Sequence, residues 1–445
     1  MLWGIQVYLT PVLAQTRTYV MSNPLENCAD ILSHLLGFVP HRQYLFFAPV
    51  SRGWREAWGR RPSATAAVSK DTSVAQLMCS FECGLQRHPG VCESIARLGM
   101  LDLLRAAREL GFPWDEDTCR AAAREGRLET LRWSWWNGCA WGKDTCAAAA
   151  KGGHLNILEW ARAEDLPWTL GTCEGAAAGG HLGILQWATI HGCSLGQRTC
   201  WEAAAGGHLS LLQWVRARGC PWDKLTCRMA ARNGHLAVLQ WARTNGCPWD
   251  ADTCDGAAEG GHLEVLRWAR ANGCDFGGHV TCWKAARGGH LDVLRWCRAN
   301  GCVWDESACW GAADGGHLDV LQWARENGCA WDENTCNSAA DGGHLHVLQW
   351  ARANGCEWDY DTCRRAASRG HLHILQWARA NGCPWNEWTC SWAARGGHLD
   401  VIKWARANGC EWDAQTIVYA RNRGHGHVVE WARANGCPEG KSTAV

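Results

Sequence analysis

A strict 27-residue repeat is the feature of this sequence that most limits what it can fold into. Residues 146–168 read CAAAAKGGHLNILEWARAEDLPW, and residues 336–358 read CNSAADGGHLHVLQWARANGCEW. A chain made of about thirteen such copies is expected to fold as a stack of small units, not as a few globular domains. The anchor positions, each a cysteine except Ile417 in the last copy, are 92, 119, 146, 173, 200, 227, 254, 282, 309, 336, 363, 390 and 417, with eleven steps of 27 residues and one of 28.

Each copy is predicted to form two helices joined by a glycine turn. A threonine precedes the anchor in most copies, as at Thr118, Thr145 and Thr253, and we expect it to cap the first helix. That helix runs through Ala-Ala and ends at Gly-Gly, where glycine permits the backbone of a helix end. The second helix begins near His-Leu, and its apolar spacing is helical. Helices this short bury their apolar faces only when neighbouring copies stack.

The repeat resembles the ankyrin repeat, over roughly residues 86–440. The run Ala-Ala-x-Gly-Gly-His-Leu-x-Val-Leu-x-Trp-Ala-Arg-x-Asn-Gly-Cys matches the ankyrin core column by column, with Trp and Ala in the leucine columns. An ankyrin repeat has about 33 residues, and the six that are missing here fall between Trp141 and Cys146, where ankyrin repeats carry a β-hairpin finger. The resemblance therefore implies an all-α, ankyrin-like solenoid of helix pairs without the fingertip surface.

Charge and motifs narrow the classes of function. Lys+Arg and Asp+Glu both number 44, so the net charge is zero. Nucleic-acid-binding proteins normally carry a basic excess, so we expect no nucleic-acid partner. No stretch reaches the roughly 18–20 apolar residues of a membrane span, so we expect no membrane partner. The chain has no P-loop, HExxH or GxSxG motif, and no nucleophile–base pair stands outside the repeat columns. We therefore predict that it is not an enzyme and has no cofactor.

Three columns invite a chemical interpretation: the histidine of Gly-His-Leu, the anchor cysteine, and a second cysteine twenty residues after it. Zinc needs four ligands at one point, usually from closely spaced pairs, and none of the 27 cysteines forms a CxxC pair. Copies with Phe112, Leu166 or Ile417 in a cysteine slot also argue against a metal. We favour buried, reduced thiols and no metal site, while pairs such as Cys139 with Cys146 stay open as redox partners.

Variation between copies, by contrast, indicates a binding surface. The two positions after the anchor change from copy to copy, and in the ankyrin frame they lie on the first helix, which lines a concave groove. Trp and Arg are enriched at binding hot spots, although variable positions are also found on unconstrained solvent-facing surfaces. The predicted partner-binding residues are Trp201, Arg228, Trp283, Trp310, Arg364, Arg365, Trp392 and Tyr419.

The sequence of residues 23–60 does not follow the repeat. It predicts an amphipathic helix that ends at a proline, followed by two further short apolar segments. These residues resemble an F-box, which implies binding to a Skp-family adaptor and a cullin, and hence a substrate-receptor subunit of a cullin-type (SCF) ubiquitin ligase. The alternative is an ankyrin-repeat scaffold without a ubiquitin link, in which this segment only caps the repeats. The predicted adaptor-binding residues are Leu25, Ile31, Leu32, Leu35, Leu36, Phe38, Pro40, Leu45, Val50 and Trp54.

The expected organisation has five parts. Residues 1–22 are predicted to be a disordered or mis-assigned N-terminus, and residues 23–60 an F-box-like segment. Residues 61–85 form a linker with a degenerate capping copy, residues 86–440 the repeats, and residues 441–445 a tail. High cysteine usage without a disulfide pattern indicates a reducing compartment, so we expect a cytoplasmic or nuclear protein that binds an unidentified target protein.

Overall fold

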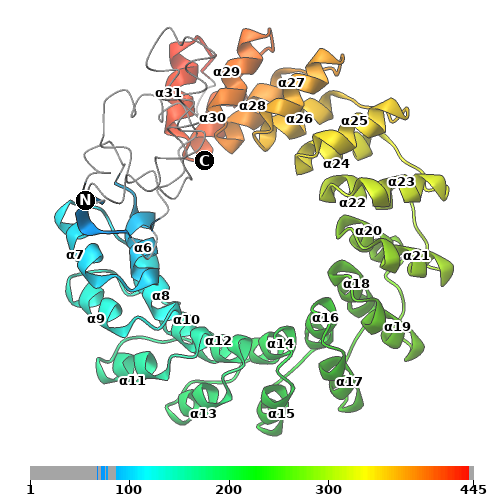
Figure 1. Cartoon of the computed structure of the whole chain (residues 1–445). Coiled ribbons are helices and arrows are strands. Elements are labelled where there is room, and N and C mark those ends of the chain that lie inside the picture. The colour runs from blue at the N-terminus through cyan, green and yellow to red at the C-terminus, as the bar shows by residue number, and fades with distance from the viewer. Residues whose placement is uncertain (1–67, 69–71, 76, 79–86, 440–445) are drawn as a thin grey trace, which may run out of the picture. The chain divides into compact units, whose positions relative to one another are not determined.

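The computed structural model describes residues 68, 72–75, 77–78 and 87–439 (Figure 1). Within these residues all regular structure is helical, with 26 helices in thirteen pairs and no strand. This confirms the predicted all-α, ankyrin-like solenoid of helix pairs. The F-box-like segment with its ten predicted adaptor-binding residues, the segment 1–22 and the tail 441–445 lie outside the described residues, as does most of 61–85.

The chain divides into two compact units, Met1–Thr199 and Cys200–Val445, and the division falls within α14 (Gln197–Ala205). We call the two helices of a copy its leading and trailing helix. In the first unit the pairs are α6 (Pro89–Leu98) with α7 (Leu101–Glu109), α8 (Glu116–Arg124) with α9 (Leu128–Trp136), α10 (Thr145–Gly152) with α11 (Leu155–Ala163), and α12 (Gly171–Gly179) with α13 (Leu182–Ile190).

The second unit holds the trailing helix α15 (Leu209–Ala217) and eight further pairs. The leading helices are α16 (Lys224–Arg232), α18 (Ala251–Gly260), α20 (His279–Arg287), α22 (Ser307–Gly315), α24 (Glu333–Gly342), α26 (Tyr360–Ser368), α28 (Glu387–Gly396) and α30 (Ala414–Asn422). The trailing helices are α17 (Leu236–Thr244), α19 (Leu263–Ala271), α21 (Leu291–Ala299), α23 (Leu318–Glu326), α25 (Leu345–Ala353), α27 (Leu372–Ala380), α29 (Leu399–Ala407) and α31 (Gly426–Ala434).

Seven of the described leading helices begin after an aspartate or asparagine whose side chain accepts a hydrogen bond in the first turn, which corrects the prediction that threonine caps them; these helices are α8, α16, α18, α24, α26, α28 and α30. In α18 the Asp250 carboxylate accepts a 3.1 Å hydrogen bond from the Asp252 backbone N–H, as an N-cap residue does. Thr253 lies inside the first turn and is buried. The turn after the helix is as predicted, because Gly261 takes a φ of 77°, which glycine adopts without the strain that a side chain would cause.

Small residues let the leading helices of neighbouring copies pack closely. A Cβ atom added to Gly175 in α12 would lie 2.2 Å from the carbonyl oxygen of Ala147 in α10, so no larger residue fits there. The trailing helices of neighbouring copies make far fewer direct contacts. Within each unit, taken by itself, the row of leading helices therefore forms the concave side and the trailing helices stand apart on the other side (Figure 1).

The core of each unit runs continuously between the two rows of helices. In the copy that begins at Cys254, the leading helix buries Ala257 and Ala258, and the trailing helix buries Val265, Leu266 and Ala269. Each of these side chains is at most 3% exposed. No single copy could enclose such a core, so the copies stabilise one another through their neighbours.

Candidate functional site

The histidine column links each copy to the one before it. Nε2 of His344 lies 3.0 Å from the backbone carbonyl oxygen of Asp314, thirty residues earlier, to which it donates a hydrogen bond. Burial holds the pKa of His344 and of His371 below the ordinary histidine value, which keeps the rings neutral. The same contact, at 3.0–3.2 Å, is made by His154, His235, His290, His371, His398 and His425.

The two cysteine columns meet inside the copies that have both cysteines. The Sγ atoms of Cys173 and Cys193 lie 2.8 Å apart, and those of Cys282 and Cys302 lie 3.2 Å apart. Cys139, left open above as a partner of Cys146, instead contacts Cys119, the anchor of its own copy. Every cysteine in the part of the chain that the structure describes is buried, and no cluster of metal-ligating side chains occurs there. These columns have packing contacts of the kind we favoured.

Tryptophan fills the space between the trailing helices. Trp331, in the loop after α23, packs edge-to-face against Trp350 of α25, with ring centroids 5.8 Å apart. The guanidinium of Arg325 in α23 lies 4.2 Å from the Trp331 ring centroid, within cation–π range. The loop tryptophan thus joins the trailing helices of two neighbouring copies. The same arrangement recurs around Trp249, Trp304, Trp358, Trp385 and Trp412.

The predicted partner-binding residues all lie half-buried on leading helices, but some of them also hold the scaffold together. The indole N–H of Trp201 in α14 donates a 2.6 Å hydrogen bond to Asp223, the N-cap of α16. Trp310 makes the same bond to the N-cap Asp332. These two tryptophans therefore stabilise the junction of two copies, and their remaining ring surface is what a partner could contact. The prediction of a partner-binding role stays untested for all eight residues.

Charges alternate along the concave side of the second unit as far as α26. Arg232 pairs with Glu259 at 2.9 Å, and Arg287 pairs with Asp314 at 2.7 Å. Arg369, at the end of α26, pairs with Asp341 of α24 at 3.0 Å. Each of these pairs joins adjacent leading helices, so the basic side chains there are neutralised by an acid of an adjacent copy.

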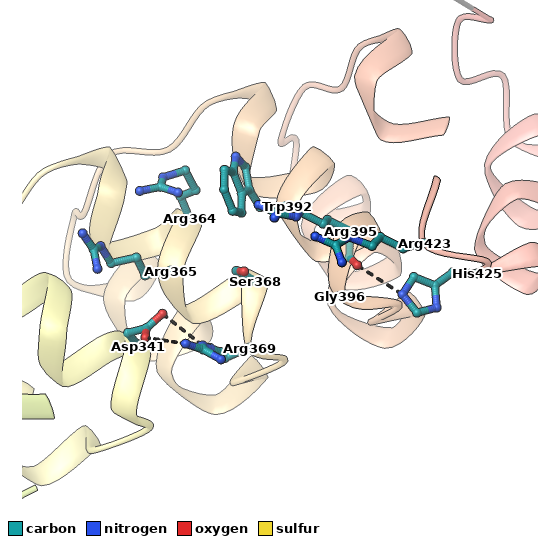
Figure 2. Close-up of a pocket in the computed structure, with 10 residues that line it drawn as sticks. All are labelled: Asp341, Arg364, Arg365, Ser368, Arg369, Trp392, Arg395, Gly396, Arg423 and His425. Carbon is teal, nitrogen blue, oxygen red and sulfur yellow. Dashed lines mark hydrogen bonds and ion pairs between the residues drawn. The ribbon is translucent and has the colours of Figure 1, made fainter. Parts of the chain in front are cut away.

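The alternation stops over α26, α28 and α30, and a basic pocket lies there. The pocket has a volume of about 740 Å³, and its lining includes five arginines and one aspartate (Figure 2). Among the described residues, Arg365, Arg395 and Arg423 have no carboxylate within ion-pair distance, whereas Arg364 and Arg369 do. The full lining is Asp341, Arg364, Arg365, Ser368, Arg369, Trp392, Arg395, Gly396, Arg423 and His425.

Trp392 lies in this pocket and contacts side chains from all three leading helices. The guanidinium groups of Arg364 and Arg395 lie 4.7 Å and 4.5 Å from its ring centroid, and Tyr419 packs edge-on at 6.3 Å. Arg364 also makes two hydrogen bonds to the Asp361 carboxylate, at 2.7 Å and 3.0 Å, which hold the pKa of that carboxyl below its usual value. The structure thus brings together four of the predicted residues, Arg364, Arg365, Trp392 and Tyr419.

Sequence reasoning predicted three of the ten residues that line this pocket, Arg364, Arg365 and Trp392. It considered only the two positions after each anchor, yet the fifth position also faces the concave side and supplies Arg395. Arg369 and Arg423 occupy the slot where other copies have the first glycine of Gly-Gly. The replacement of that glycine by arginine could have indicated a binding position from the sequence alone, because nothing in the turn itself requires a charge.

The described residues form a helical-repeat protein, with a strongly basic pocket on the concave side of its second unit. The chain matches no protein-family model and no curated protein sequence. Among solved structures it is similar to the crystal structure of the human ASB11 ankyrin repeat domain, at 18% sequence identity and a TM-score of 0.30, over 36% of this chain and 84% of that one. Among the described residues no helix is both long and apolar enough to cross a membrane.

Proposed function

We propose that the chain is a binding module that recruits a partner protein with the concave side of its leading helices. The observation that carries the proposal is that the constant and the variable positions of the repeat have different roles. Histidine and loop tryptophan make contacts that join neighbouring copies, and the cysteines make contacts within a copy. The positions that vary, by contrast, lie on the leading helices and include the lining of the basic pocket. The proposed role is binding, and no reaction is assigned to the chain.

The F-box-like segment extends this proposal to a ubiquitin ligase. Its resemblance supports a substrate-receptor subunit in which residues 23–60 bind a Skp-family adaptor, the adaptor binds a cullin, and the repeats bind the target. Support for this step comes from the sequence alone. The rival role is a scaffold that binds partners without a ubiquitin link.

Site-specific photo-cross-linking tests the concave surface. A photoreactive residue at Met229, half-buried on α16, is expected to capture a partner protein, whereas one at Glu264, exposed on α19, is expected to capture none. Trp283→Ala, on α20, the second leading helix after α16, should reduce the Met229 product if the partner lies along this face. Equal capture from Met229 and Glu264 would contradict the proposal.

Co-precipitation with adaptor and cullin tests the ligase role separately. We expect the full chain to capture both, and the Leu35→Asp/Trp54→Ala double variant to capture neither, since these substitutions change two of the predicted adaptor-binding residues. If wild type and variant are both folded and neither binds the adaptor, the chain is a scaffold. Cross-linking from Met229 would then still stand, because it does not depend on the adaptor.

A further inference from the structure

We propose that the basic pocket over α26, α28 and α30 binds an acidic segment of the partner protein, about six residues long and rich in aspartate and glutamate. This inference rests on the proposed function, because it names the chemistry of the partner that the concave side recruits. It would make the pocket the place where partner choice is decided, since the basic side chains on the leading helices α16–α24 are already paired with acids.

The charge balance of the pocket is the first argument. Along α16–α24 each pair joins a base to an acid of the adjacent copy, as Arg287 does with Asp314 at 2.7 Å. Arg365, Arg395 and Arg423 lie on three successive copies and have no such acid in the described part of the chain. Like charges held near one another are unfavourable until an anion joins them, so this part of the surface is complementary to carboxylates.

Unused donors are the second argument. Nε of Arg365 and Nε1 of Trp392 are both buried and have no hydrogen-bond partner among the described residues. A buried N–H without an acceptor costs free energy that a suitable ligand recovers. Both side chains line the pocket (Figure 2). Carboxylates accept hydrogen bonds and carry the charge that the arginines lack, whereas apolar or basic segments offer neither.

The dimensions indicate the length of the segment. Neighbouring packed helices have axes about 8–10 Å apart, so α26, α28 and α30 span about 16–20 Å. An extended peptide advances about 3.3 Å per residue, so about six residues cross the three helices. The pocket volume of about 740 Å³ lies within the range of roughly 300–1,000 Å³ typical of ligand sites. It has room for more than one acidic side chain.

The surroundings favour a protein segment over a nucleic acid. Proteins that bind single strands stack bases on free aromatic rings, but the Trp392 ring already has two guanidinium groups over it, at 4.7 Å and 4.5 Å. The chain also has no net positive charge, and among the leading helices α16–α30 the arginines without an ion pair lie on only three copies.

Fluorescence anisotropy with the full chain tests the proposal. The probe is a labelled hexaglutamate peptide, and hexaglutamine and an oligothymidylate of similar length serve as comparisons. The variant is Arg365→Gln/Arg395→Gln/Arg423→Gln. Its matched control is Arg267→Gln/Arg295→Gln/Lys403→Gln, which removes three charges from exposed positions on α19, α21 and α29.

We expect hexaglutamate to bind wild type and the control variant alike, and to bind the pocket variant at least about tenfold more weakly, because three charge pairs are lost. Raising the salt should weaken binding further, since exposed charges are screened. Arg423→Gln alone, at an exposed position, should give a smaller loss. It also keeps the test valid if circular dichroism shows that the triple variant is misfolded.

Three results would overturn the proposal. They are failure of wild type to bind hexaglutamate, equal binding of hexaglutamine, and equal affinity of the pocket and control variants for hexaglutamate. Tighter binding of oligothymidylate through the same arginines would assign the pocket to a nucleic acid and would also refute it. If the peptide fails while cross-linking from Met229 persists, the acidic segment is wrong and the proposed partner-binding face remains.

Discussion

Trp331→Ala should open the junction between two copies while leaving distant copies intact. The substitution removes the edge-to-face contact with Trp350, at 5.8 Å, and the stacking of Arg325, at 4.2 Å. An aromatic pair contributes about 0.5–1.5 kcal/mol beyond its burial, and an exposed cation–π contact about 0.5–1 kcal/mol. Truncation of a core tryptophan costs about 3–5 kcal/mol, and Trp331 is only partly buried. We therefore expect a loss of about 3 kcal/mol at this junction.

Hydrogen exchange measured by mass spectrometry on the full chain is the appropriate assay. Stability in a repeat protein is close to a sum over neighbouring copies, so a single global transition would blur a local effect. A loss of about 3 kcal/mol should make amides of α22–α25 exchange about a hundredfold faster, whereas amides of α16–α19 should keep their wild-type rates. Trp331→Phe should retain most of the protection, because Phe276 makes the equivalent contacts with Trp296 and Arg270 at the junction of its two copies.

Two results would refute this reasoning. Trp388 is 48% exposed on α28, so Trp388→Ala should cost less than about 0.5 kcal/mol, and an equal cost for Trp331→Ala would mean that pairing contributes nothing. A double-mutant cycle of Trp331→Ala and Trp350→Ala should give a coupling of about 1 kcal/mol. A coupling near zero would show that the two rings act independently.

Three further outcomes follow from the repeat contacts. Burial raises the pKa of the Cys146 thiol to about 12, so Cys146 should resist a disulfide reagent at pH 8 until urea unfolds the chain, and rapid labelling of the native protein would contradict its burial. Since burial lowers the pKa of His344 and His371 below the unfolded value of 6.5, their neutral rings support the fold above that pH. The melting temperature should fall as the pH is lowered from about 6.5 toward 5, and a flat profile would argue against it. Gly316→Ala should destabilise more than Gly301→Ala in urea titrations, because both have φ near 80° but only at Gly316 would the new Cβ meet a ring, that of His344 at 2.5 Å; equal losses would refute the clash.

The sequence was sufficient to predict the helix pairs, because the 27-residue period, the glycine turns and the apolar spacing all repeat. It was misleading about the start of the leading helix. Thr253 has the chemistry of a cap, but Asp250 is placed three residues earlier and its carboxylate reaches the free N–H of Asp252. Both residue types recur in the repeat, so spacing alone could not distinguish the cap from a buried threonine.

The candidate site was predictable only in part, because its contacts join residues of different copies. The pair between Arg369 and Asp341 spans 28 residues, and a list of variable positions does not show which of them neutralise one another. The pocket emerges only when the pairs are assigned and Arg395 and Arg423 are left without acids. Arg364 was predicted to bind a partner, yet in the structure it donates hydrogen bonds to Asp361. The sequence alone does not show whether an arginine pairs within the chain or contacts a partner.

The contact between His344 and the Asp314 backbone has a consequence for how such a chain can change over time. The histidine donates its hydrogen bond to a backbone carbonyl group, which every residue has. The side chain at position 314 can therefore be substituted without loss of this hydrogen bond. The same holds at Arg395, whose carbonyl receives His425 while its guanidinium faces the pocket. Substitutions can thus change the binding surface of one copy at a time, and whole copies can be gained or lost. The histidine contact between copies does not depend on which side chain the neighbouring copy carries at that position.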